Sequence, residues 1–341
     1  MDGTKRQDFQ TVIRSVVRQR STRYTSSHNL SLRWEEDDSS AVNDAANFQA
    51  ILGALQLSPA REVVVSSTDN LPGWTMRGAF LDILSELELV GRPNSGKKTC
   101  NADQNLVSLV LHDDMIVPHV DVLFIFDCCY GYVACRAAEP SPRIVEFIAA
   151  TEPSSPLALA PPRNTVTNKL LGEIKRRQRE GYYHVEIADV VESLRSREAA
   201  VKRPTHGLKV GANSICLPFS RRLTLDPTRN DPALKAVFSV HLLDDMSKEE
   251  KKQFVDWLRT LPPRASMTLE GIYPTGSTCL IMTSAWGIWS KLAGMKGFKH
   301  ISDITGPNTL SHRELLAVSS SASQENVPFS SQKGPSAKPC W

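Results

Sequence analysis

One uninterrupted apolar run, VLFIF at residues 122–126, constrains the fold more than any other stretch of the chain. The run is short, contains aromatic and β-branched residues and does not alternate with polar ones, which predicts a strand buried on both faces. It ends directly in DCCYG (127–131), a polar sequence with two thiols. Open α/β sheets place their sites at the carboxyl ends of their strands, so this edge is a candidate active site. The alternative is a core strand that ends in two small, inert cysteines.

Composition excludes several classes of protein. The chain has 341 residues, 41% hydrophobic and 23% charged, which is typical of a soluble protein long enough for two domains. A net charge of +3 gives no reason to expect a nucleic-acid partner. The seven cysteines are odd in number and have no C-x-x-C spacing, which argues against a disulfide framework and a structural zinc site and favours a reducing, cytoplasmic location. No apolar run approaches the roughly 18 residues of a membrane span, and we expect no cofactor.

Strands and helices alternate between residues 41 and 222. Apolar periodicity predicts helices at 41–57, 77–90, 166–179 and 187–197. Short apolar runs predict strands at 61–67, 122–126, 144–149 and 214–219. This alternation is typical of an α/β fold, a three-layer αβα sandwich around a mainly parallel sheet. The basic run KRRQR at 175–179 is expected to be a solvated helix face rather than an anion or nuclear-import patch.

A small α+β domain is predicted at residues 233–303. A strand at 235–243 precedes a helix at 247–261, which Ser247 and Glu250 begin as a capping box. A strand pair at 267–273 and 277–283 and a short aromatic helix at 285–292 complete a βαββα order. The three tryptophans of this domain are expected to form an aromatic core, with a partner surface as the alternative; they are Trp257, Trp286 and Trp289.

The two ends of the chain carry the weakest patterns. Residues 1–40 are predicted to be a poorly ordered N-terminal segment with a loosely docked basic helix, and a targeting segment is the alternative. The acidic stretch at 28–42 predicts a loop. The Ser-rich tail at 304–341 is predicted to be disordered.

Several motifs together resemble a known family. The sequence FDCCYG resembles the nucleophile motif of the caspase and metacaspase superfamily, which are cysteine peptidases. Five stretches in order look like the caspase-like domain common in fungal proteins; they are AVNDA, SSTDNLPGWTMRG, DVLFIFDCCYG, IVEFIAAT and NTVTNKLLGEI. The unit after residue 232 looks like the extension that often follows that domain. The resemblance covers residues 40–300 and implies a caspase-like fold and a polypeptide substrate.

The resemblance implies a role for three residues. Cys129 matches the nucleophile because only it gives C-x-G with Gly131, and Cys128 occupies the small-residue position before it. Asp127 matches the aspartate that helps hold a basic P1 side chain. Such a peptidase needs a thiolate nucleophile, a histidine that activates it and backbone N–H groups that hold the oxyanion.

The general base is the point at which this chain departs from the family. The family's histidine lies in a His-Gly turn about 50 residues before the cysteine, where this chain has RGAFLDIL. The strand that would carry it, and the usual first strand before AVNDA, are both missing from the sequence pattern. His112 and His119 precede Cys129 in a polar connection, and the other candidates follow it; these are His184, His206, His241 and His300.

Two functions therefore stay open. The chain is either a cysteine endopeptidase that is impaired for lack of a base, or a non-catalytic binding or regulatory module with a protein partner. Metal binding by Cys128, Cys129 and Cys135, or calcium binding by Asp113 and Asp114, is the weaker alternative, and no structural metal is expected. Asp44 is expected to make a structural hydrogen bond.

Overall fold

The structure of this chain is a computed structural model. Contacts divide the chain into two units, residues 1–305 and 306–341. All described residues belong to the first unit; they are 3–18, 24, 26–36, 41–91, 120–126, 141, 143–150, 165–197, 203–219, 232, 234–274 and 277–304.

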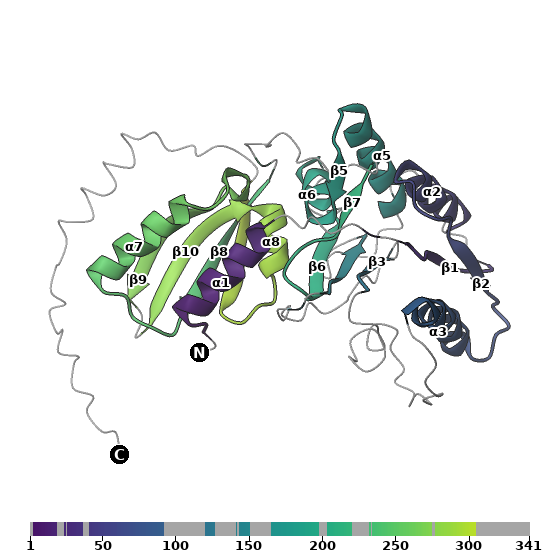
Figure 1. Cartoon of the computed structure of the whole chain (residues 1–341), viewed down its shortest axis with the longest axis horizontal. Coiled ribbons are helices and arrows are strands. Elements are labelled where there is room, and N and C mark those ends of the chain that lie inside the picture. The colour runs from purple at the N-terminus through teal and green to yellow at the C-terminus, as the bar shows by residue number, and fades with distance from the viewer. Residues whose placement is uncertain are drawn as a thin grey trace, which may run out of the picture. The chain divides into compact units, whose positions relative to one another are not determined.

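The fold is a mixed α/β arrangement of helices and separate small sheets (Figure 1). Between residues 30 and 219 the helices are α2 (Ala41–Ala54), α3 (Pro72–Gly91), α5 (Val166–Arg179) and α6 (Ile187–Arg197). The strands are β1 (Leu30–Trp34), β2 (Arg61–Val65), β3 (Val122–Phe126), β4 (Val145–Ala149), β5 (His184–Glu186), β6 (Thr205–Val210) and β7 (Cys216–Pro218). Helices α2, α3, α5 and α6 confirm the predicted helices, with differences at the ends of α2 and α3.

Three sheets form in this region among the described residues. Strands β1 and β2 pair in parallel, β3 and β4 pair in parallel with β6 antiparallel on the other side of β4, and β5 pairs antiparallel with β7. A single, mainly parallel sheet was predicted for this region. The described strands instead form three sheets, in which the β1–β2 and β3–β4 pairs are parallel and the β4–β6 and β5–β7 pairs are antiparallel. The strand predicted at 214–219 lies in the β5–β7 pair instead of closing the main sheet.

Helices lie against both faces of the β3–β4–β6 sheet. On one face, Phe80 of α3 packs against Phe124 of β3, with ring centroids 6.4 Å apart. On the other face, Ile148 of β4 is fully buried in the main core with side chains from α2, α5 and α6. Asp44 on α2 accepts a hydrogen bond from the Thr167 hydroxyl on α5 at 2.8 Å, which confirms its predicted structural role.

Two strand predictions need correction. Residues 30–34 form β1 rather than part of a loop, because LSLRW pairs along its whole length with β2. A strand therefore does precede AVNDA, and the prediction that this strand is missing was wrong. Strand β3 was expected to be buried on both faces, but its five residues are only partly buried. Within the described residues, β3 has a neighbouring strand on one side only. The central strand is therefore β4, and all five of its residues are buried.

The α+β elements between residues 235 and 304, which we call the small unit, form a four-stranded antiparallel sheet covered by helices. Its elements are β8 (Lys235–Leu242), α7 (Lys248–Arg259), η3 (Pro263–Ala265), β9 (Thr268–Pro274), β10 (Thr278–Ala285), α8 (Trp286–Leu292) and β11 (Phe298–Ile304). The sheet order is β11-β8-β10-β9. The βαββα prediction therefore lacked the last strand, which completes the β-α-β-β-α-β order of a split βαβ motif. The capping box of Ser247 and Glu250 is confirmed.

The N-terminal helix belongs to this small unit. Helix α1 (Arg6–Val17) lies beside α8, against the sheet of this unit (Figure 1). It buries Phe9, Ile13 and Val16 completely, in one core with side chains of α7, α8 and the sheet. The prediction of a poorly ordered segment was wrong for residues 6–17. The sequence did not show this because the residues on which their apolar stripe packs lie more than 200 residues away along the chain. Trp286 and Trp289 are buried and Trp257 packs against the core, which confirms the aromatic core.

Candidate functional site

The predicted active-site edge is the place where β3 and β4 end together. Phe126, the last residue of β3, pairs with Ala149, and the Ala150 N–H donates to the Phe126 carbonyl at 3.1 Å. Asp127 and Cys129 follow directly but lie in 127–140, outside the described residues. The structure therefore places the strand that leads to the predicted nucleophile and leaves the position of the nucleophile itself a prediction.

One described histidine lies at this same edge of the sheet. Strand β6 runs antiparallel to β4, so its first residues lie beside the end of β4, with His206 opposite Ile148. Ile148 in turn pairs with Ile125 of β3. His206 is thus two strands from β3, about 10 Å away at ordinary strand spacing.

His206 is the centre of a buried polar cluster that joins three elements. Its Nε2 lies 2.5 Å from Glu146 Oε1 on β4, and its Nδ1 lies 2.8 Å from the Ser290 Oγ on α8. Glu146 also accepts hydrogen bonds from the Ser214 hydroxyl and from the Ile215 N–H, the latter at 2.7 Å. Both carboxyl oxygens of Glu146 therefore have partners, as a buried polar group requires.

This cluster has the residue types of a serine-hydrolase triad but cannot act as one. The Ser290 hydroxyl donates to the Gly287 carbonyl at 3.0 Å within its own helix. The exposed fractions of Ser290, His206 and Glu146 are 1%, 2% and 0%, so no substrate reaches the hydroxyl. We read the cluster as a structural connection between β4, β6 and α8.

The other described histidine candidates have separate surroundings. His184 lies on β5, and His300 contacts Asp303 at 3.0 Å and stacks on Trp289. The His241 Nε2 lies 4.0 Å from the Cys279 sulfur on the neighbouring strand β10. Burial raises the pKa of the Cys279 thiol, which disfavours the thiolate that a nucleophile needs. This pair is therefore a poor substitute for a peptidase dyad.

A second polar cluster, which we call the ionic junction, lies between β5, α6, α8 and η3. Glu186 accepts from the Lys291 ammonium at 2.6 Å and from the Arg264 guanidinium at 3.2 Å. Burial alone would raise the pKa of Glu186, but the charges of Lys291 and Arg264 outweigh it and hold this pKa below its ordinary value. Burial, with the nearby charge of Glu186, instead raises the pKa of Asp189. The junction thus joins the α/β elements to the small unit by buried charges.

The basic run on α5 is not simply a solvated face. Arg177 is buried; its guanidinium donates to Glu173 at 2.9 Å and to the Asp189 carbonyl at 2.7 Å. Arg176 also binds Glu173. Although burial opposes ionisation, these hydrogen bonds lower the pKa of Glu173 to about 2. The prediction of a solvated face was wrong for Arg177.

Sequence reasoning missed Glu146 and the two hydroxyl groups of the His206 cluster, those of Ser214 and Ser290. One signal was present: Glu146 interrupts the otherwise apolar strand RIVEFIAAT. A carboxylate in a buried strand requires hydrogen-bond partners from elsewhere in the fold. The sequence does not say which residues supply them.

Comparison with known proteins gives no match to a family model, a curated protein or a solved structure. Among the described residues, no group of three or more His, Cys, Asp or Glu side chains could hold a metal ion. The metal candidates Cys128, Cys129, Cys135, Asp113 and Asp114 lie outside those residues. Within the same part of the chain, none of the helices is long and apolar enough to cross a bilayer.

Proposed function

We propose that this chain is a homologue of the caspase and metacaspase cysteine endopeptidases, with a caspase-like αβα sandwich and with Cys129 in the nucleophile position. The observation that carries the proposal is the course of β3, a strand parallel to the buried β4 that ends one residue before Asp127. The motif FDCCYG then begins where an open α/β sheet presents its reactive groups. Asp127 would help to hold a basic P1 side chain of a polypeptide substrate.

We further propose that peptide hydrolysis by this chain is impaired. His206, which lies on the same sheet, is buried between Glu146 and Ser290 and would have to leave both to act as a base. The sequence lacks the His-Gly strand of the family. A cysteine without a base keeps a small thiolate fraction, which supports slow reaction with an electrophile but not efficient turnover.

The experiment that tests this proposal is labelling with an irreversible electrophilic peptide that carries Arg at P1. We expect slow labelling that is lost in Cys129→Ala and kept in the matched control Cys128→Ala, with little cleavage of Arg or Lys fluorogenic peptides. Equal labelling of both variants would refute the nucleophile assignment. Efficient cleavage that His112→Ala or His119→Ala abolishes would show that a base is present and that impairment is wrong.

The alternative is a non-catalytic binding or regulatory module of the same fold. The engagement of His206 in a structural cluster favours it, because a module that only binds does not need a free base. This alternative predicts that Cys129→Ala binds a polypeptide or protein partner as tightly as the unaltered chain. A cytoplasmic location is part of both proposals.

A further inference from the structure

Helix α1 packs on the small unit as a separate ligand would. Its apolar stripe, Phe9, Ile13 and Val16, repeats at helical spacing and is completely buried. The Phe9 ring lies 5.6 Å from that of Phe254 on α7 and 5.8 Å from that of Phe298 on β11, between ring centroids. We call the surface that receives this stripe the α1 groove; residues that contact Phe9 there are Phe254, Trp257 and Phe298.

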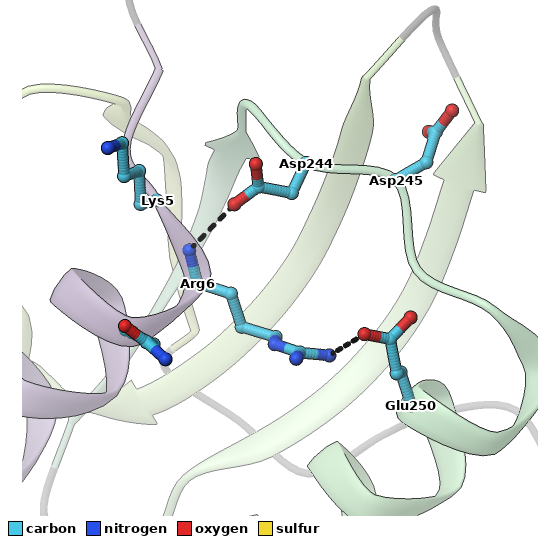
Figure 2. Close-up of a pocket in the computed structure, with 6 residues that line it drawn as sticks. Lys5, Arg6, Asp244, Asp245 and Glu250 are labelled. Atoms are coloured by element: carbon cyan, nitrogen blue, oxygen red, sulfur yellow. Dashed lines mark hydrogen bonds and ion pairs between the residues drawn. The ribbon is translucent and has the colours of Figure 1, made fainter.

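The small unit also satisfies the first turn of α1. Lys5, at the N-cap position, makes no side-chain capping bond. The Arg6 N–H instead donates to the Asp244 carboxylate, which follows β8, at 3.4 Å, and the Arg6 guanidinium contacts Glu250 of α7 at 2.9 Å (Figure 2). These groups line a surface pocket of about 200 Å³, where the negative carboxylates lie at the positive end of the helix dipole. Just before α1 in the chain, Thr4 forms a β-bridge with Leu242 at the end of β8.

The last turn of α1 is satisfied in the same way. The Arg264 guanidinium, from η3, donates twice to the Val17 carbonyl, at 2.7 and 3.2 Å. A carbonyl at the end of a helix has no partner within the helix, so a cation placed there replaces the missing donor. On the side of the helix, the Arg14 guanidinium lies 5.7 Å from the centroid of the Trp257 ring.

A helix of 12 residues is marginal in water on its own, and α1 takes its caps from the small unit. Its helical form therefore depends on the groove, and its covalent attachment to the rest of the chain raises its local concentration there. Contacts of this kind are the same whether the helix comes from its own chain or from another copy.

We propose that the α1 groove is a helix-binding site that accepts α1 in trans, so that a second copy of this chain can supply the helix once the chain's own α1 has left the groove. The site recognises an amphipathic helix with an aromatic residue, apolar residues four and seven positions later, and an arginine three positions before the aromatic. This inference does not rest on the peptidase proposal.

The test uses the full chain with a specific protease site inserted between Arg18 and Tyr24. After cleavage, a fluorescent peptide of residues 3–18 is added and its anisotropy is followed. We expect capture by the cleaved chain, through exchange with its own α1, and little capture by the uncleaved chain, whose tethered helix competes.

Competitor peptides give the matched controls. Thr11 is exposed and Ile13 is buried, so Thr11→Asp and Ile13→Asp add the same charge to opposite sides of the helix. We expect the Thr11→Asp peptide to compete nearly as well as the unaltered one, the Ile13→Asp peptide to be weaker by about 100-fold or more, and Arg6→Ala to be weaker by about two- to fivefold. Equal competition by the first two peptides, no exchange at all, or unfolding of the cleaved chain would each overturn the proposal.

Discussion

The two larger sheets of the molecule hold their helices by different chemistry. In the small unit, aromatic side chains fill the space between the sheet and its helices; Phe238 of β8, Phe9 of α1 and Phe254 of α7 are each at most 1% exposed. In the β3–β4–β6 sheet, the face toward α8 carries Glu146 and His206 beside the apolar Ile148 and Leu208, and all four are buried to a similar degree. Apolar contacts are held by area removed from water, and the buried polar groups add the requirement that they stay paired.

This difference determines how each region should respond to change. Loss of an apolar side chain leaves a cavity whose cost is set by volume and hardly depends on pH. Loss of one member of a buried polar cluster leaves its partners without hydrogen bonds, and the cost of an ionised pair follows its titration. Substitutions in the two regions can therefore be compared at equal burial.

The largest effect is expected for Glu146→Ala. It leaves the His206 ring, the Ser214 hydroxyl and the Ile215 N–H without their buried acceptor. We expect a loss of about 4 kcal/mol in the free energy of unfolding, measured by urea denaturation. Glu146→Gln, which keeps one acceptor oxygen, should lose less. A loss below about 1 kcal/mol for the alanine variant would mean that the cluster is not structural.

Ile13→Ala should have the next largest effect. It removes buried volume from the α1 groove and should cost about 3 kcal/mol. The exposed neighbour provides the control, since Thr11→Ala should change stability by less than about 0.5 kcal/mol. The Ile13→Ala loss should be the same at pH 5 and pH 8. A loss that changes strongly between these values would show that the packing of this apolar stripe also depends on charge.

Lys291→Met should produce a smaller and pH-dependent loss. Glu186 keeps Arg264 when Lys291 is removed, so we expect a loss of about 2 kcal/mol at pH 7. The pKa of Glu186 is lowered in the folded protein, so the stability it contributes is complete above its ordinary pKa and is lost as the pH falls. Urea denaturation of both chains between pH 7 and pH 3 should therefore show the difference between them shrinking. A constant difference would contradict this account.

Elements decided by local pattern were predictable, and elements decided by distant partners were not. Helices α5 and α6 begin and end at the predicted residues, because their apolar spacing and flanking residues mark them locally. Strand β6, THGLKV, was missed because a short strand with His, Gly and Lys has a weak pattern, and its pairing with β4 sets it. The apolar stripe of α1 was visible, but the groove that receives it was not.

The same distinction between local pattern and distant partners applies to the candidate site. The strand that leads to Cys129 was predictable from its apolar run, and β3 has the predicted bounds. The engagement of His206 was not predictable, because Glu146, His206 and Ser290 are far apart in sequence and meet only when β4, β6 and α8 pack. Spacing along the chain carries no information on such contacts.

The smallest effect is expected at an ion pair on the β1–β2 pair. The Arg33 guanidinium lies 2.6 Å from Glu62, but 42% of the Glu62 side chain is exposed to solvent. Water replaces the lost partner of either residue, so a double-mutant cycle of Arg33→Ala and Glu62→Ala should give a coupling energy of about 0.5 kcal/mol. Added salt should reduce it further. A coupling as large as the Glu146→Ala loss would show that burial is not what makes the polar groups of the β3–β4–β6 sheet costly to remove.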